Sequence, residues 1–232
     1  MSNKRQKTSM PRSTNGAIRL TDVLSIVAII ISFLTFVFSI WQTNRQYYSQ
    51  KKENQPIFQL KSYYTKCNND SVFDTDVVEI KNIGREALSL ENTQYVTFIK
   101  LEVRNNQHQQ LLYIPVTGYY TLCHRHGLIG DVETNLTPGN NLDYHNFYIE
   151  CMQNSKDSNY YFCNLIKFVI IHYMDIYDEK HVVYFESDNK CSEEYYMDVI
   201  QKSKETFKDV SFDIHELKLK DLMDYITIND NV

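Results

Sequence analysis

The longest apolar segment of the chain lies near its N-terminus. The run VLSIVAIIISFLTFVFSIW, from Val23 to Trp41, contains no charged residue. As a helix with a rise of about 1.5 Å per residue, this run is long enough to cross the roughly 30 Å hydrocarbon core of a bilayer. A cleaved signal peptide has a shorter apolar stretch and small residues before its cleavage site, whereas this run ends in bulky aromatic residues. The pattern therefore predicts an uncleaved transmembrane helix over residues 21–42, after a basic polar tail over residues 1–20.

Small and polar residues follow one stripe of this predicted helix. They recur in alternating steps of four and three, a spacing with a period of 3.5 residues, and they are Ser25, Ala28, Ser32, Thr35 and Ser39. Small residues let helices approach closely in lipid, so the stripe predicts self-association through an oligomerisation face. The alternative is that the hydroxyl groups bond to carbonyl groups of their own helix.

The residues flanking the span are suited to the membrane–water interface. Residues 43–55 are polar and predict a juxtamembrane helical linker, which Pro56 ends. The side chains expected to contact lipid headgroups are aromatic or basic, and they are Arg19, Trp41, Arg45, Lys51 and Lys52.

The orientation of the span is not decided by the sequence. Five basic residues precede it and four follow it closely, so the positive-inside rule slightly favours a cytoplasmic N-terminus and a C-terminal domain outside. The chain has five cysteines without a CxxC motif, and this odd number suits free thiols in a reducing compartment. Both orientations in a cell membrane therefore stay open.

After Pro56 the hydrophobic pattern changes to alternation with a period of two. Nine segments rich in Val, Ile, Tyr, Phe and Thr are predicted to be strands: 56–64, 76–82, 87–92, 95–103, 110–116, 119–124, 142–152, 160–174 and 181–187. Turn residues separate them, and no helix is expected between them. The pattern predicts a mainly β fold, with an antiparallel immunoglobulin-like β-sandwich over residues 56–190.

The last 42 residues, 191–232, change to helical spacing. One helix is predicted to begin after Ser192, and a second at Asp213. We expect these helices to cover an edge of a sheet, and docking of a partner is the alternative.

Charge excludes one class of partner. Residues 1–41 have a net charge of +4 and the whole chain −5, so the remainder carries about −9. An acidic domain repels the phosphate backbone, and we expect no nucleic-acid binding.

Two clusters contain residues of the kind that bind metals. Cys123, His124 and His126, with His145 further on, could supply nitrogen and sulfur ligands for zinc, although the second half of a standard zinc motif is missing. A polar loop is the simpler interpretation. Residues 131–135 alternate oxygen donors, but Leu136 stands where a calcium loop needs glycine.

Sequence motifs of catalysis are missing. The chain has no G-x-S-x-G, no glycine-rich phosphate loop and no H-E-x-x-H. We therefore expect no enzyme activity and no cofactor.

Two stretches resemble a known group of proteins. VVEIKNIGREALSLEN (77–92) and FVIIHYMDIYDEKHVVYFE (168–186) are similar to poorly characterised bacterial single-pass membrane proteins with a C-terminal β-sandwich. The shared features are an N-x-G after a strand, at Asn82 and Gly84, and a hairpin with Tyr173, Asp175 and Tyr184. Asp178 replaces the usual hairpin glycine, and Tyr184 is displaced. The resemblance implies a fold and no catalytic residues.

These observations together predict a membrane-anchored, noncatalytic binding or sensing module. It would self-associate through its transmembrane helix, and its sandwich would bind a protein or a small molecule. One alternative is a membrane effector of a bacterial defence or toxin system that acts by oligomerising in the bilayer. The other is an anchored metal-dependent hydrolase that uses the histidine region.

Overall fold

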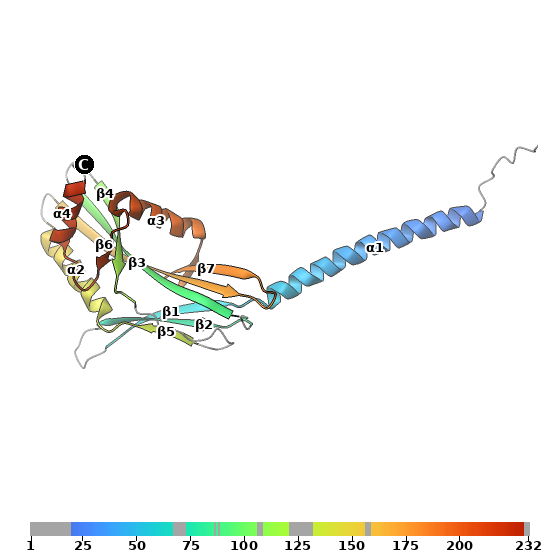
Figure 1. Ribbon diagram of the computed structural model, residues 1–232, viewed down its shortest axis with the longest axis horizontal. Helices are drawn as coiled ribbons and strands as arrows, with labels where there is room; N and C mark the ends of the chain where they lie inside the picture. The colour runs from blue at the N-terminus through green and yellow to red at the C-terminus, as the bar shows by residue number, and fades with distance from the viewer. Residues whose placement is uncertain are drawn as a thin grey trace, which may run out of the picture. The chain divides into compact units, whose positions relative to one another are not determined.

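The computed structural model describes residues 20–66, 73–85, 87, 89–105, 109–120, 132–155 and 159–229. The chain divides into two units, residues 1–52 and 53–232. The first unit contains helix α1 (Leu20–Glu53), in which no residue is buried (Figure 1). Among the described residues, α1 is the one helix long and apolar enough to span a membrane. The helix continues through most of the polar stretch after Trp41.

The second unit contains two sheets. The smaller sheet has the order β1-β2-β5 and is antiparallel, with β1 (Phe58–Thr65), β2 (Thr75–Asn82) and β5 (Val132–Leu136). The larger sheet has the order β8-β7-β6-β3-β4-β9. Its strands are β3 (Ser89–Asn105), β4 (Gln109–Thr117), β6 (Asn159–Met174), β7 (Lys180–Glu186), β8 (Asn189–Cys191) and β9 (Phe212–Asp213). Its neighbours are antiparallel except β9, which runs parallel to β4.

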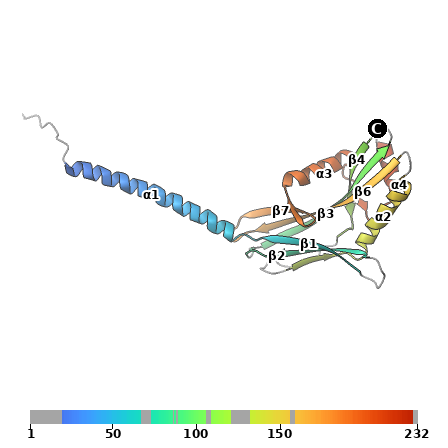
Figure 2. The same ribbon diagram turned by 180° about the vertical axis from the view of Figure 1, so that it is seen from behind.

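Three helices complete this unit: α2 (Asn140–Asn154), α3 (Glu193–Phe207) and α4 (Leu219–Asn229). Figure 1 shows α3 over one face of the large sheet, and Figure 2 shows the small sheet, α2 and α4 on the other side. Alternate residues of a strand point to opposite faces, so each face of β3 and β6 has its own core. Phe98 and Phe168 pack against Val199 of α3, whereas Ile99 and Cys163 lie in a core with residues of α2 and α4.

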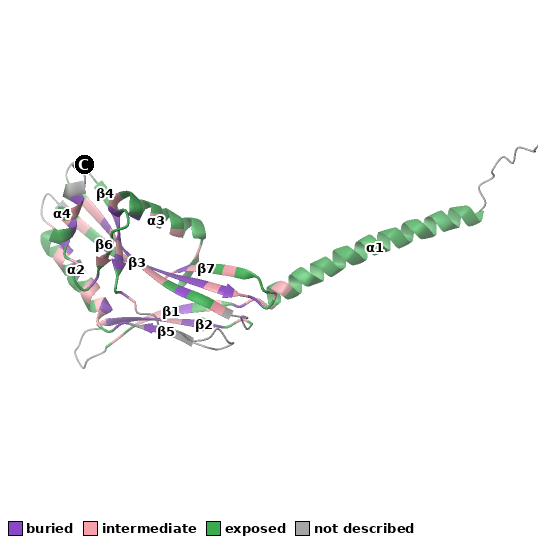
Figure 3. Ribbon diagram, in the orientation of Figure 1, coloured by how far each residue is buried: buried purple, intermediate pink, exposed green. Residues whose placement is uncertain are grey.

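The face of the large sheet opposite α3 is called the inner face. Two different parts of the domain cover it. The small sheet contributes Leu60, Val78 and Ile80 to one core, which it shares with Val169 and Ile171 of β6. Further along the same face, α2 and α4 cover the other core. Figure 3 shows buried residues concentrated where these elements face the long strands. A seam between the two cores therefore crosses the inner face of the sheet.

Most of the predicted strands are confirmed, with two changes of detail. The segments 87–92 and 95–103 belong to one long strand, β3, which has an irregularity in its pairing between Leu90 and Asn92. Tyr119 and Tyr120 follow β4 without continuing it as a strand, and the rest of the segment 119–124 lies outside the described residues.

Two predictions were wrong. Residues 142–152 are helical and form most of α2, because Tyr144, Phe147 and Cys151 recur at helical spacing and pack on the large sheet. The last helix begins at Leu219, since Asp213 belongs to β9. In the segment 131–135, which the sequence already disfavoured as a calcium loop, residues 132–135 belong to strand β5.

The coarse fold class is confirmed: a long apolar helix precedes a β-rich domain that ends in helices. Two facing sheets are what a sandwich requires. The immunoglobulin-like topology is not confirmed, because α2 interrupts the order of the strands and shares the inner face with the small sheet.

Candidate functional site

A buried ion pair lies at the seam between the two inner cores. Lys167 Nζ of β6 is 2.6 Å from Asp76 Oδ2 of β2, and the two side chains are 10% and 0% exposed. Val78 and Ile80 of β2 face the large sheet, so Asp76, two residues before Val78, projects from the same face. Lys167 likewise shares its face with the apolar Val169. Both charges are thus held inside the domain next to inward-facing apolar residues, Val78 of β2 and Val169 of β6.

Two tyrosines complete the surroundings of the Asp76 carboxylate. The hydroxyl groups of Tyr119 and Tyr120 donate to Asp76 Oδ2 at 2.9 and 3.1 Å. Burial first, and then the negative charge of Asp76, raise the pKa of both tyrosines above the ordinary value. They therefore stay protonated and act as donors, and three donors converge on one carboxylate oxygen.

Asn140, the first residue of helix α2, connects that helix to this network by hydrogen bonds. Its Oδ1 accepts from the main-chain N–H of Asp76 at 2.7 Å, and its Nδ2 donates to the carbonyl of Asp76 at 3.1 Å. The same Nδ2 donates to the carbonyl of Tyr119 at 2.8 Å. Because β5 pairs with β2 only as far as Val77, the Asn140 side chain satisfies main-chain groups of β2 beyond the end of β5. The first residue of α2 therefore sets the position of both Asp76 and Tyr119.

The inner face of the small sheet also carries buried polar atoms that make no hydrogen bond to the described residues. Four buried atoms have no hydrogen-bond partner among the described residues: Asp76 Oδ1, Ser62 Oγ, and Oδ1 and Nδ2 of Asn135. In the ladder, Val78 lies between Ser62 and Asn135, and these residues share one face. Buried polar atoms are normally satisfied by protein or by bound water, so this face is suited to holding ordered water.

A pocket of about 460 Å³ adjoins the network. It is lined by residues 92–97 of β3 and by residues 116–120, which include both tyrosines of the network. The chain leaves β4 at Gly118, where φ is +79° and an added Cβ would lie 2.9 Å from Asp213 Oδ1. Glycine is therefore needed for the turn that carries Tyr119 and Tyr120 to the pocket wall.

The lining of the pocket is uncharged and mixes polar with apolar groups. It combines three tyrosines, of which Tyr95 and Tyr120 have ring centroids 5.6 Å apart, with threonine, asparagine and glutamine side chains. No charged residue occurs among the described residues that line it. Such a surface can pack on an apolar face of a ligand and donate or accept hydrogen bonds. It offers no full charge to an ionic ligand.

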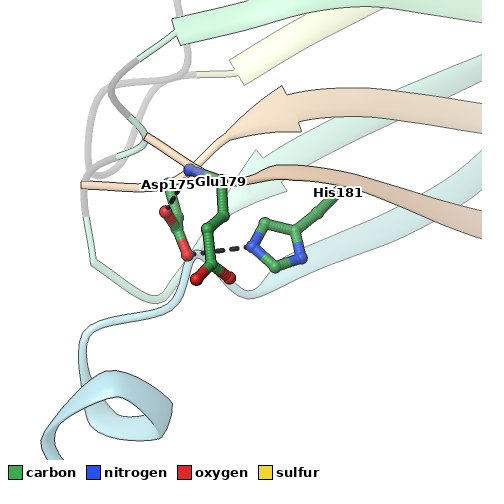
Figure 4. A group of neighbouring side chains, drawn as sticks. All are labelled: Asp175, Glu179 and His181. Atoms are coloured by element: carbon green, nitrogen blue, oxygen red, sulfur yellow. Dashed lines mark hydrogen bonds and ion pairs between the residues drawn. The ribbon is translucent and has the colours of Figure 1, made fainter. Parts of the chain in front are cut away.

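A second polar cluster occupies the turn between β6 and β7 (Figure 4). Asp175 Oδ2 lies 2.9 Å from His181 Nε2, and Asp175 Oδ1 accepts from the main-chain N–H groups of Tyr177 and Glu179. Burial raises the pKa of Asp175, but these N–H groups and His181 outweigh it, so the pKa lies below the ordinary value. Asp175, Glu179 and His181 have ligand atoms within 4.8 Å of one another and could hold a metal ion. Since both oxygens of Asp175 already accept hydrogen bonds, the cluster is explained as a stabilised hairpin turn.

The predicted metal site lies largely outside the described residues. Cys123, His124 and His126 lie outside the described residues. His145 is on α2, where it is exposed and its ring stacks on Tyr148 with centroids 6.2 Å apart. The zinc site considered for Cys123, His124, His126 and His145 therefore stays a hypothesis.

The proposed oligomerisation face lies along α1. The hydroxyl groups of Ser25, Ser32, Thr35 and Ser39 each donate to the carbonyl four residues earlier, at 2.8 Å. Their hydrogen-bonding capacity as donors is thus used within the helix, as the alternative interpretation expects. Any self-association would then depend on close packing of this face, which also includes Ala28.

The described members of the predicted membrane interface lie in the C-terminal half of the same helix. The Arg45 guanidinium is 5.5 Å from the ring centroid of Trp41, and Lys51 and Lys52 lie in the last turn. Arg19 lies outside the described residues. The basic last turn is favourably placed at the negative end of the helix dipole.

The motifs behind the resemblance have structural roles. Asn82 Oδ1 accepts from the main-chain N–H of Ile57 and of Gly84, and Asn82 Nδ2 donates to the carbonyl of Arg85. A Cβ at Gly84 would lie 2.4 Å from the Ile57 nitrogen, so the N-x-G sequence permits close approach of the segment before β1. Tyr173, from the hairpin motif, packs edge-on against Phe58 of β1.

Comparison with known proteins does not assign a family. No protein-family model and no curated protein matches the sequence. Four chains of solved structures match, and one of them is the ApaA protein from Bordetella pertussis. That structure is 11% identical, its match covers 58% of this chain and 94% of that chain, and the TM-score is 0.19. Similarity at this level supports no conclusion about function.

The residues that sequence reasoning missed are Asp76 and Lys167. Lys167 lies in the strand predicted over residues 160–174, directly before the apolar run 168–171. A lysine facing inward from such a strand requires a buried partner, and this was the available signal. Its partner could not be chosen among 29 acidic residues, because the choice depends on how the small sheet packs.

Proposed function

We propose that this protein is a membrane-anchored, noncatalytic binding or sensing module. In this proposal α1 crosses the bilayer, and the β-rich domain binds a small molecule in the pocket formed by residues 92–97 and 116–120. The observation that carries the proposal is the construction of the pocket wall. Tyr119 and Tyr120 are held by hydroxyl bonds to one buried carboxylate oxygen, which Lys167 neutralises.

The uncharged lining supports a neutral ligand. A phosphate or ammonium group entering the pocket would lose its hydration without meeting an opposite charge in the described lining, and such a transfer is costly. A neutral molecule with hydroxyl or amide groups and one apolar face meets hydrogen-bonding side chains and tyrosine rings. The proposed ligand class is therefore small, neutral and polar.

Preorganisation supports binding by this wall. Tyr119 is buried, and its ring lies edge-on to Tyr120 with centroids 4.8 Å apart. Side chains fixed before a ligand arrives lose little conformational freedom on binding, so more of the interaction energy remains as affinity. The ion pair and Asn140 act as positioning residues in this proposal, behind the surface that the ligand would touch.

A thermal-shift experiment tests the proposal. The full chain in lipid nanodiscs is unfolded by heating, and the tyrosine signal in near-ultraviolet circular dichroism is followed with neutral sugars, small amides, inorganic phosphate or polyamines at millimolar concentration. We expect one or more neutral compounds to raise the midpoint. Tyr95→Ala, which removes an inner-face ring from the lining, should abolish the shift, whereas Tyr160→Ala, exposed on β6 outside the lining, should retain it. Stabilisation by phosphate or polyamines alone would contradict the proposed ligand class.

The remaining parts of the proposal concern assembly and placement. We propose that the face of Ser25, Ala28, Ser32, Thr35 and Ser39 supports homo-oligomers by close helix packing. The N-terminus is proposed to be cytoplasmic and the β-rich domain to lie outside, following the small excess of basic residues before the span. The two sheets are proposed to be an immunoglobulin-like sandwich in which α2 and α4 take over part of the second layer.

A further inference from the structure

Two cysteines meet in the core between α2 and the large sheet. Cys151 is in the last turn of α2 and is 0% exposed, and Cys163 on β6 is 4% exposed. Both belong to the same apolar core, which also contains Phe147 and Leu101. Helix α2 packs directly on β6, so the two thiols approach from facing elements.

Hydrogen bonds join α2 to β6 around the two thiols. Ser155 Oγ donates to the Cys151 carbonyl at 3.0 Å and accepts from the main-chain N–H of Tyr161 at 3.0 Å. The hydroxyl of Tyr144 donates to the Cys163 carbonyl at 3.4 Å. These bonds hold the end of α2 against the part of β6 that carries Cys163.

The third described cysteine is excluded from this pair by its position. Cys191 on β8 packs against the core on the outer face of the large sheet, together with Phe168 and Val199. Cys151 and Cys163 lie in the core on the inner face. The sheet therefore separates Cys191 from the other two thiols.

We propose that Cys151 and Cys163 form a disulfide bond when the domain matures in contact with a disulfide oxidant such as oxidised glutathione. One of the two thiolates attacks one sulfur of the oxidant, which releases one reduced thiol and leaves a mixed disulfide. The other thiolate then attacks the protein sulfur of this mixed disulfide and releases the second reduced thiol. Two S–H bonds are lost and one S–S bond forms, and the two electrons and two protons reduce the oxidant to two thiols.

The bond would attach the C-terminal end of α2 to the sheet. The first residue of this helix, Asn140, holds Asp76 and the Tyr119 carbonyl, so both ends of α2 would then be fixed. Cross-linking stabilises the folded domain mainly by restricting the unfolded chain. The oxidised domain should therefore resist denaturation better than the reduced domain. Because both thiols are buried, the bond should form during folding rather than on the finished domain.

Refolding under a defined redox buffer tests this assignment. The full chain is unfolded and reduced in detergent, refolded with oxidised and reduced glutathione, unfolded again under alkylating conditions, and digested for mass spectrometry. We expect a Cys151–Cys163 linked peptide in most molecules, with Cys191 alkylated. The urea midpoint should be higher after oxidised than after reduced refolding. This difference should disappear in Cys163→Ala and persist in the control Cys191→Ala.

Two results would contradict the proposed disulfide bond. Alkylation of both Cys151 and Cys163 in most oxidatively refolded molecules would overturn the proposal, as would predominant linkage of either residue to another cysteine. If Cys163→Ala does not fold, Cys151→Ala gives the same comparison, and the linked peptide of the wild-type chain decides the assignment without any variant.

Discussion

Lys167→Met should destabilise the β-rich domain strongly, because it leaves the Asp76 carboxylate buried without its cation. Removing one member of a buried ion pair costs about 3–5 kcal/mol, against a total stability of about 5–15 kcal/mol for a typical domain. The two side chains are 10% and 0% exposed, so solvent screens this pair little. The free energy of unfolding is measured by urea denaturation of the full chain in nonionic detergent, followed by near-ultraviolet circular dichroism.

A matched lysine serves as the control. Lys180 lies 2.9 Å from Glu91, but these side chains are 72% and 33% exposed, so Lys180→Met should cost less than about 1 kcal/mol. The double variant Asp76→Asn with Lys167→Met should be more stable than Lys167→Met alone, because asparagine keeps an acceptor for the tyrosine hydroxyls and carries no charge. A loss in Lys167→Met no larger than in Lys180→Met would refute the reasoning.

Three further results are expected. Gly84→Ala should lower the free energy of unfolding by about 1–3 kcal/mol, because the new Cβ would lie 2.4 Å from a main-chain nitrogen; an unchanged urea midpoint would contradict this. The folded pKa of Asp175 is lowered, so its stabilisation is present above the ordinary aspartate value and is lost as the pH falls below about 4. The wild-type stability should therefore fall more steeply there than that of Asp175→Asn, and parallel pH profiles would show that the carboxylate contributes nothing. Replacing Ser25, Ser32 and Ser39 together with leucine should abolish cross-linked oligomers in membranes, whereas changing three isoleucines off that face to leucine should preserve them.

Strand positions were predictable where one face is buried against another layer. In β2, Val78 and Ile80 face the core while Lys81 is exposed, and period-two alternation reports this arrangement directly. The apolar run of α1 was equally clear, since a long uncharged segment has few alternatives. For both β2 and α1, the local sequence pattern is sufficient to predict the element.

Helix α2 shows where composition misleads. Its tyrosine, phenylalanine and isoleucine residues are typical of strands, yet Asn140, Tyr144, Phe147 and Cys151 are spaced by four, three and four. Gly139 has φ +83° and supplies the turn before the helix. The helical spacing was present in the sequence and should have outweighed the composition, because burial follows spacing.

The candidate site was less accessible to sequence reasoning. Its charges come from β2 and β6, and its tyrosines follow β4, so the site forms only after the two sheets pack. The ion pair joins Asp76 and Lys167, which are 91 positions apart, so it depends on how the sheets pack and not on local spacing. Of the histidines in the predicted metal site, His145 alone lies among the described residues, exposed on α2, so that site stays a prediction.

The most direct test of the central claim is native mass spectrometry of the full chain released from its own membranes. The account predicts that the wild-type chain and Tyr160→Ala each carry a small neutral adduct, which is missing from Tyr95→Ala. Lipids bound to α1 would appear as adducts on all three proteins. An adduct that is missing from one variant is therefore not a lipid bound to α1. Identical adducts in all three, or none in the wild-type chain, would contradict the assignment of the pocket as a ligand site.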